Sequence, residues 1–169
     1  PIADRVGWHL DRRRPFAGEA AWRMSDAWCP TYETSIDPAD CTSLGGSGQV
    51  EASFETPAIA LPERVASLVE LWIYADLPDN DGLSTPLDGL ELQVLTPTTA
   101  PVTAWSTRTS PVPARRWTPV LIDLTLFLGK TVSLRFEFDS LDGRDNRYEG
   151  VALGRLRVRT ACGADRDAA

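Results

Sequence analysis

The stretch TVSLRFEFDS, residues 131–140, alternates apolar and polar side chains along most of its length. The apolar side chains occupy the even positions Val132, Leu134, Phe136 and Phe138. A repeat of two residues is the period of a β-strand that turns one face to a core and the other to water. The stretch therefore predicts a half-buried strand.

Comparable strand signals recur along the chain, at residues 20–24, 49–56, 67–76, 89–96, 102–106, 117–122 and 151–160. The segment SLVELWIYAD, residues 67–76, is apolar on both faces, which is typical of a central strand covered on two sides. In the last segment the apolar positions change from odd (Leu153) to even (Leu156). This change of parity predicts a β-bulge at Gly154-Arg155.

Helix signals are nearly absent, and 13 prolines and 12 glycines interrupt the chain. About eight strands joined by turn-rich loops predict an all-β fold, a single antiparallel β-sandwich of jelly-roll type over residues 1–162. Residues 163–169 are expected to form a flexible tail or linker. One short helical turn is predicted at 123–129, with Asp123 able to cap its start and Gly129 to end it.

The bulk properties exclude two classes of partner. The formal net charge of −7 argues against nucleic acid, which needs a basic footprint. No apolar run approaches the roughly 20 residues of a membrane-spanning helix, so membrane insertion is not expected. The chain starts at Pro1 and has no apolar signal segment, and it is expected to be a module of a longer parent chain with neighbouring domains.

The three cysteines indicate the compartment. Cys29 and Cys41 flank the loop CPTYETSIDPADC, and a disulfide that closes it would contribute roughly 3 kcal/mol to stability. The alternative is three reduced thiols, and Cys162 has no evident partner. A disulfide favours an oxidising compartment, so the protein is expected to be secreted or displayed on the cell surface. The single histidine, His9, leaves too few ligands for a Cys/His zinc site.

The C-terminal half carries a recognisable pattern, RWTPVLIDLTLFLGKTVSLRFEFDSLDGRDNRYEGVALGRLRV, residues 116–158. It resembles the closing half of the bacterial jelly-roll modules that accompany immune-inhibitor-A-like secreted metallopeptidases and are similar to MAM and carbohydrate-binding sandwiches. The matching residues are Trp117, Asp123, Leu124, Gly129, Lys130, Thr131, Val132, Leu134, Arg135, Phe136, Phe138, Asp139, Ser140, Asn146, Tyr148, Glu149 and Gly150. Residues upstream, from about Trp8, match more loosely.

The resemblance implies a non-catalytic accessory module, because the peptidase motif H-E-x-x-H does not occur in this chain. It also exposes a departure. Gly154 and Arg155 stand where members of the family have an acidic pair, one of which helps related jelly rolls hold a structural calcium ion. We infer from this difference that the ion site is lost.

Two acidic loops are candidate cation sites. In DSLDGRDNRYEG, residues 139–150, four carboxylates could supply oxygens to calcium: Asp139, Asp142, Asp145 and Glu149. Arg144 and Arg147 lie in the same loop, and the favoured interpretation is a turn whose charges pair with one another. A second cluster comprises Asp76, Asp79 and Asp81, followed by Gly82; it fails the EF-hand pattern, although another kind of calcium site stays open. No cofactor other than calcium is suggested.

Aromatic side chains are the candidate ligand contacts, because their faces stack on sugar rings. Trp28, Tyr32, Trp105 and Tyr148 are selected as candidates, although a core position is the favoured alternative for each. Trp72 is expected in the core, and Trp22 and Trp117 are expected to pack the sandwich.

Three functions follow from these patterns. The first is an accessory binding module of a secreted or cell-surface bacterial protein that recognises a glycan or a protein surface. The second is a structural spacer that supports a neighbouring catalytic domain. The third, and least favoured, is a hydrolase with two carboxylates, which would need a cleft that brings two Asp or Glu side chains together.

Overall fold

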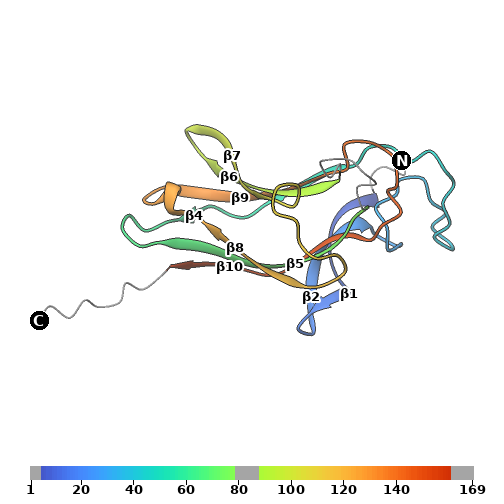
Figure 1. Ribbon diagram of the computed structural model, residues 1–169, viewed down its shortest axis with the longest axis horizontal. Coiled ribbons are helices and arrows are strands. Elements are labelled where there is room, and N and C mark those ends of the chain that lie inside the picture. The colour runs from blue at the N-terminus through green and yellow to red at the C-terminus, as the bar shows by residue number, and fades with distance from the viewer. Residues whose placement is uncertain (1–4, 79–87, 161–169) are drawn as a thin grey trace, which may run out of the picture.

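The computed structural model describes residues 5–78 and 88–160, which form two β-sheets packed face to face (Figure 1). The strands are β1 (Val6–Phe16), β2 (Glu19–Asp26), β3 (Glu51–Glu55), β4 (Ile59–Ala60), β5 (Ser67–Asp76), β6 (Gly89–Thr96), β7 (Thr99–Ser106), β8 (Thr118–Asp123), β9 (Thr131–Asp139) and β10 (Gly150–Thr160). A 3-10 helix, η2 (Thr125–Phe127), separates β8 from β9, and the described residues contain no α-helix. The predicted antiparallel β-sandwich is confirmed, with ten strands in place of about eight.

The connectivity is that of a jelly roll. Sheet I has the strand order β1-β2-β10-β5-β8, and sheet II has the order β3-β9-β6-β7, with β4 paired to β9. All of these pairs are antiparallel. The chain crosses from one sheet to the other between β2 and β3, β4 and β5, β5 and β6, β7 and β8, β8 and β9, and β9 and β10. Sequentially distant strands therefore become neighbours, as they do in two-sheet jelly rolls.

The core lies between the sheets and follows the predicted alternation. In β9 the even-numbered side chains point inward, and Phe136 and Phe138 are almost completely buried. In β5 the odd-numbered side chains Val69, Leu71 and Ile73 meet them from sheet I. Burial of this apolar surface is the main stabilising contribution to the sandwich.

Trp72 lies elsewhere than expected. It is even-numbered in β5, pairs with Gly154, and faces away from the sandwich on the outer side of sheet I. Its ring centroid is 5.0 Å from that of Phe16, which also contacts Trp117 at 5.1 Å. The expectation that Trp72 belongs to the inter-sheet core is therefore wrong, because a second apolar layer exists outside sheet I.

Strand β1 supplies this second layer and was not predicted. Its segment RRRPF is strongly charged, so it lacks the alternation of a strand. Arg14 nevertheless lies over the ring of Tyr74, 4.3 Å from the ring centroid, and pairs with Glu149. The last residues of β1 thus cover part of the outer face of sheet I, because Arg14 and Phe16 lie against Tyr74 and Trp72 of β5.

Two local predictions are confirmed. The register between β10 and β5 shifts between Gly154 and Arg157, and Arg155 has φ 48°, so a β-bulge lies at the predicted place. In the predicted helical turn, the Thr125 N–H donates to Asp123 Oδ1 (2.8 Å), and Gly129 follows η2 with φ 72°. That positive φ favours glycine and ends the turn.

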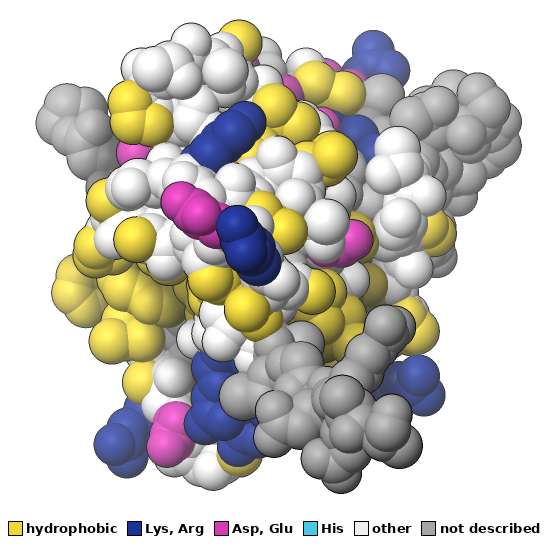
Figure 2. Space-filling view, turned by 90° about the vertical axis from the view of Figure 1, so that its left-hand side faces the viewer, with side chains coloured by type: hydrophobic (Ala, Val, Ile, Leu, Met, Phe, Trp, Pro, Cys, Tyr) yellow, Lys and Arg dark blue, Asp and Glu magenta, His cyan; other side chains and the backbone are white. Residues whose placement is uncertain are grey.

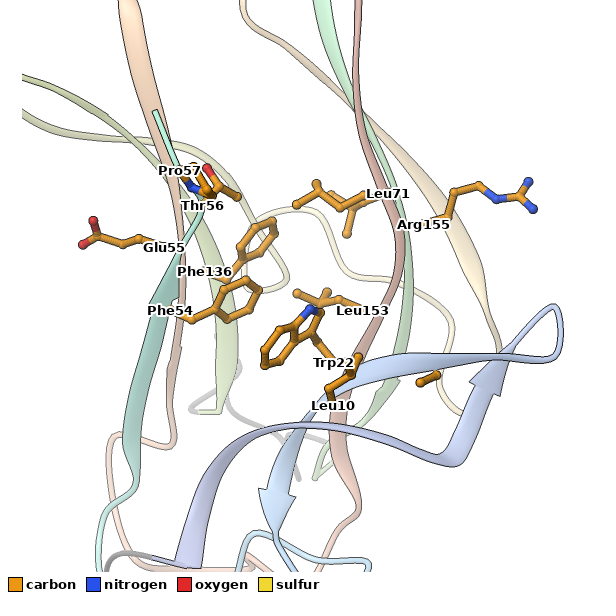
Figure 3. Close-up of a pocket in the computed structure, with 12 residues that line it drawn as sticks. Leu10, Trp22, Phe54, Glu55, Thr56, Pro57, Leu71, Phe136, Leu153 and Arg155 are labelled. Carbon is orange, nitrogen blue, oxygen red and sulfur yellow. The ribbon is translucent and has the colours of Figure 1, made fainter. Parts of the chain in front are cut away.

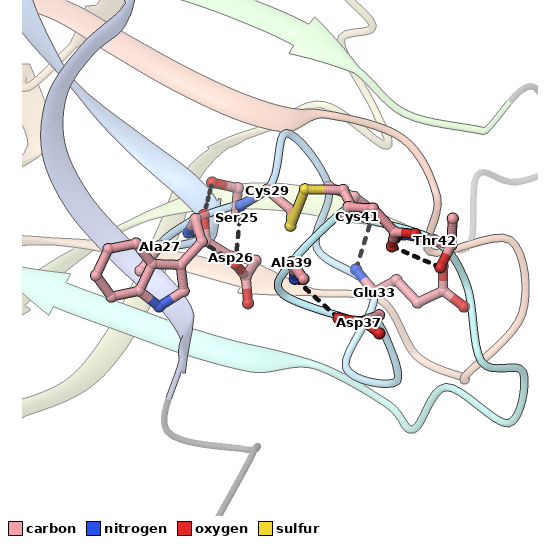
Figure 4. The surroundings of a disulfide bond; sticks show 12 residues. Ser25, Asp26, Ala27, Cys29, Glu33, Asp37, Ala39, Cys41 and Thr42 are labelled. Atoms are coloured by element: carbon pink, nitrogen blue, oxygen red, sulfur yellow. Dashed lines mark hydrogen bonds between the residues drawn. A yellow bond between two sulfur atoms is a disulfide. The ribbon is translucent and has the colours of Figure 1, made fainter.

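The predicted disulfide between Cys29 and Cys41 is present and closes the loop that leads from β2 toward β3 (Figure 4). Cys29 is completely buried, and its N–H donates to Asp26 Oδ1 (2.9 Å). The bond therefore anchors a long irregular connection to the end of β2. Cys162, the proposed tail 163–169, and Asp79, Asp81 and Gly82 lie outside the described residues.

The opposite end of the sandwich is formed by η2, the β6–β7 turn and the end of β10. Figure 2 views this end and shows hydrophobic side chains interspersed with charged and polar ones. Leu126 of η2 is the most exposed large hydrophobic side chain among the described residues, at 82%. This end therefore presents a mixed surface.

Candidate functional site

A candidate binding feature among the described residues is an apolar groove between the β1–β2 hairpin and β3, which we name the β2–β3 groove. Its volume is about 380 Å³, and twelve residues line it. Figure 3 shows side chains of both sheets projecting into it. Its apolar lining comprises Leu10, Ala20, Trp22, Phe54, Pro57, Leu71, Phe136, Leu153 and Leu156.

The groove exists because the two sheets end at different places along this edge. Near the start of the hairpin, Trp8 Nε1 donates to the Ala52 carbonyl (3.1 Å) and joins β1 to β3. Strand β3 ends at Glu55, and Pro57 follows. Beyond that point the inward side chain of Leu10 in sheet I is left largely exposed, whereas Trp22 meets Phe54 of β3.

A column of three aromatic rings forms one wall. The rings of Phe136 and Phe54 stack at 4.9 Å, and those of Phe54 and Trp22 stack at 5.2 Å, with interplanar angles of 17° and 19°. Phe136 belongs to the core, whereas Trp22 is 41% exposed. The expectation that Trp22 simply packs the sandwich is therefore incomplete. The Trp22 ring extends the apolar core to the surface.

The polar groups at the groove are few. Glu55 is the only carboxylate among the lining residues, and Arg135 Nε donates to its Oε1 (2.8 Å). The guanidinium of Arg155 lies 5.2 Å from the Phe16 ring centroid, and its side chain extends away from the other lining side chains in Figure 3. Trp22 Nε1 has no acceptor among the described residues. An apolar group suits this lining better than a strongly hydrated one does.

The four aromatic candidates from the sequence do not form one site. Trp28 is 65% exposed on the disulfide-closed loop, whereas Tyr32 is completely buried and offers no ring face to a ligand. Trp105 and Tyr148 are partly buried and pack against the core. The Tyr32 ring packs in the core, 5.1 Å from the Phe138 ring between centroids, and its buried hydroxyl donates to the carboxylate of Asp88.

The candidate calcium carboxylates of the 139–150 loop have separate partners. Asp139 Oδ1 accepts from the Leu141 N–H (2.7 Å) and Asp142 Oδ1 from the Arg144 N–H (2.8 Å). Asp145 lies 3.5 Å from Arg147, while Glu149 pairs with Arg14 of β1. Residues 5–78 and 88–160 contain no group of three or more His, Cys, Asp or Glu side chains placed to hold a metal ion. Two of the four carboxylates thus accept backbone N–H groups of the loop, one pairs with an arginine of the loop, and one pairs with an arginine of β1.

Asn146 and Gly143 fix this loop against the rest of the molecule. Asn146 Nδ2 donates to the Gly48 carbonyl (3.0 Å) and to Ser47 Oγ (3.3 Å). A Cβ at Gly143 would lie 2.0 Å from the Ser47 carbonyl oxygen. Two loops from different parts of the sequence thus meet at backbone contact distance.

Asp88 is the carboxylate with the largest change in proton affinity. Burial raises its pKa to about 6; the Tyr32 hydroxyl opposes the change, and the nearby Asp142 and Asp139 add to it. Desolvation of the charged form is the dominant cause. This pair lies in the loop end and lines neither the β2–β3 groove nor the polar hollow described below.

Two cavities bear on the carboxylate pair that hydrolysis needs. Among the described residues, Glu55 is the one carboxylate that lines the β2–β3 groove, and Asp76 is the one that lines a polar hollow beside Arg115. Two-carboxylate hydrolysis requires both groups at one scissile bond. These two cavities do not support that chemistry.

No protein-family model matches the chain, and no curated protein matches it either. The resemblance to jelly-roll accessory modules thus rests on the sequence pattern described above. Among the described residues, no helix is long and apolar enough to cross a membrane.

The sequence pattern did not predict the groove, because the residues that line it come from six separated segments. Leu10 lies in a charged segment, and Phe54, Leu71, Phe136 and Leu153 carry the ordinary signature of core positions. The one available signal was the proline after β3, which shortens one edge of the sandwich. Sequence alone does not show which side chains of the other sheet are exposed as a result.

Proposed function

We propose that this domain is a non-catalytic accessory module that binds a protein partner through the β2–β3 groove. The observation that carries the proposal is the apolar groove of about 380 Å³, walled by the Phe136–Phe54–Trp22 column. Rigid aromatic side chains at a partly exposed site are typical anchors of protein interfaces. Leu10 and Leu156, 59% and 37% exposed, extend the apolar surface at the mouth.

The choice of a protein over a glycan follows from the lining. A sugar ring gains from stacking, but its hydroxyl groups also need hydrogen-bond partners, and the groove offers few. An apolar side chain from a protein segment loses little on entering such a site. The disulfide is compatible with work outside the cytoplasm, and we place the module in a secreted or cell-surface protein.

The experiment compares two leucine-to-lysine variants. Peptides selected from a random display library against the chain are titrated against the parent, Leu10→Lys and Leu126→Lys. Leu10 lies at the groove mouth and Leu126 lies outside it, and both are exposed, so both variants are expected to fold. We expect Leu10→Lys to weaken binding about tenfold and Leu126→Lys to leave it within about twofold.

Two results would refute the protein-binding role. One is a failure to select any peptide; the other is a set of peptides that bind Leu10→Lys as well as the parent. A glycan array run in parallel separates the classes, because glycan binding that Leu10→Lys abolishes would reassign the groove to carbohydrate.

One observation favours carbohydrate as a second candidate, at a different place. The indole of Trp28 is 65% exposed, and its backbone N–H donates to Asp26 Oδ1 (2.7 Å) beside the disulfide. An exposed aromatic face on an anchored backbone suits stacking on a sugar ring. Glycan binding lost in Trp28→Ala and retained in Leu10→Lys would support this site.

A further inference from the structure

A second cavity lies at the end of sheet I, apart from the β2–β3 groove. Asp76, Arg115, Arg147 and Tyr148 line it, and its volume is about 330 Å³. We name it the Arg115 hollow. No residue lines both cavities, so the two can be tested independently.

The carboxylate in the hollow is already neutralised. Asp76 is buried; its Oδ1 accepts from Arg115 Nε (2.8 Å) and its Oδ2 from the Glu149 N–H (3.2 Å). The neighbouring Glu149 pairs in turn with Arg14. Asp76 therefore positions the Arg115 guanidinium and leaves its terminal nitrogens for another partner.

Arg115 is held in place by its backbone as well. Its N–H donates to the Ala75 carbonyl (2.7 Å), and its φ is 54°. A non-glycine residue in this left-handed region stores conformational strain, and such residues are often found at functional sites. The guanidinium thus projects from a fixed point at the end of β5.

The free side-chain groups that the described residues bring to the hollow can all donate hydrogen bonds. Among the described residues, the terminal nitrogens of Arg115 and the hydroxyl of Tyr148 have no partner. Arg147 has only an exposed contact with Asp145 at 3.5 Å, and a pair so open to water contributes little. Two guanidinium groups, which only donate, beside a phenol that can also donate match an anionic oxygen group.

We propose that the Arg115 hollow binds a carboxylate side chain of an acidic protein segment. The guanidinium fork fits a planar carboxylate through two parallel hydrogen bonds. A uronic acid would gain the same ion pairs, but the Tyr148 ring packs against the core and is only partly exposed, so stacking adds little for a sugar. A flexible acidic side chain of a peptide can bind through the hydrogen-bond donors of the hollow alone, without ring stacking.

The test is an NMR titration of the full chain with hexaglutamate, which reports on the arginine Nε–Hε signals. We expect shifts of the Arg115 and Arg147 signals, and about tenfold weaker binding in Arg115→Gln/Arg147→Gln. Arg116→Gln is the matched control, because Arg116 is adjacent and exposed, changes the net charge equally per substitution, and does not line the hollow. Hexaglutamine is expected not to bind.

Four outcomes would overturn the proposal. The first is Arg116→Gln weakening hexaglutamate binding as much as Arg147→Gln does, which would indicate a diffuse charge effect. The second is hexaglutamine binding as well as hexaglutamate. The third is polygalacturonate binding while hexaglutamate does not, which would make the site one for acidic sugars. The fourth is no shift of the Arg115 or Arg147 signals at saturating hexaglutamate. Arg147→Gln alone keeps the test valid if Arg115→Gln perturbs the fold, since the Arg147 side chain is 71% exposed.

Discussion

The two outer faces of the sandwich differ in what covers them. The strands of sheet II carry five carboxylates and one arginine, and their outward side chains face water. The outer face of sheet I carries Trp72 and Tyr74, over which Phe16 and Arg14 of β1 are folded. Sheet II is thus covered mainly on its inner face, whereas sheet I is covered on its inner face and partly on its outer face.

This difference explains where small residues are needed. Gly150, Ala152 and Gly154 share the outer side of β10, and a Cβ at Gly154 would lie 2.6 Å from Phe16 Cβ. Among the described residues, sheet II has no comparable row of small residues on its outer face, where the Arg108 side chain lies against Gly89 alone of the glycines. An extra layer on a sheet requires space in the strand beneath it as well as apolar groups above it.

The largest effect is expected from filling that space. Gly154→Val would push the new side chain against Cβ and Cγ of Phe16, close to the backbone of β1, where little relaxation is possible. We expect the free energy of unfolding to fall by about 2–3 kcal/mol. Denaturant unfolding measures it, and Ser53→Val on the exposed face of β3 is the control, expected to stay within about 0.5 kcal/mol of the parent. Equal losses in the two variants would show that the covered face is no more tightly packed than the bare one.

The next effect concerns two buried carboxylates, one attached to each sheet. Burial raises the pKa of Asp88, just before β6, to about 6. The native state therefore holds this proton more tightly than the unfolded chain, and stability is lost as the pH rises from about 4 through 6. Asparagine does not titrate, so in Asp88→Asn we expect the fall in the free energy of unfolding with rising pH to be smaller by about 1–3 kcal/mol. Thermal or urea unfolding between pH 4 and 8 measures this difference.

Asp26 of β2 provides the opposite case. Burial would raise its pKa, but the N–H groups of Trp28 and Cys29 together with Arg5 outweigh burial and lower it. Its stabilisation is present above the ordinary aspartate pKa and is lost as the pH falls below it. Asp26→Asn should therefore destabilise the protein more at pH 7 than at pH 3. If the free energy of unfolding depended on pH in the same way in Asp88→Asn and Asp26→Asn, the opposite pKa shifts of the two carboxyl groups would be contradicted.

The smallest effect compares two arginine–carboxylate pairs, one on each face. Arg14 Nε donates to Glu149 Oε1 (2.9 Å) while its guanidinium lies over Tyr74, whereas Arg135 pairs with Glu55 on the open face of sheet II. We expect Arg14→Ala to cost about 1 kcal/mol and Arg135→Ala less than about 0.5 kcal/mol. Urea unfolding at two salt concentrations distinguishes them, since the exposed pair should be the more sensitive to salt. A larger loss for Arg135→Ala would reverse the ranking of the two faces.

Alternation in the sequence was sufficient for most of the fold. The strands at 67–76 and 89–96 have the observed bounds, and the bulge at Gly154-Arg155 follows from parity alone. Strand β1 was missed because Arg12, Arg13 and Arg14 hide its pattern. Arg14 is stabilised by its contacts with Glu149 and Tyr74, which lie far away in the sequence and which no local pattern reveals.

The candidate sites were less accessible to prediction than the fold. The alternation of Trp72 with Ile73 identified a doubly covered strand but not which side Trp72 faces. The β2–β3 groove and the Arg115 hollow are made by residues that are distant in sequence, and their exposure depends on where neighbouring strands end. Of the aromatic candidates, Tyr148 lines the hollow, while Tyr32 packs in the core and its hydroxyl donates to Asp88.

The positions at which β1 begins and β10 ends have a mechanical consequence. They lie at opposite ends of the sandwich (Figure 1), and β2 runs antiparallel between the two strands. Tension applied at these two points would load the β1–β2 ladder and the shorter β2–β10 ladder, which has three paired positions, in shear. We expect hydrogen bonds that are loaded in this way to resist stretching together and not to open one after another.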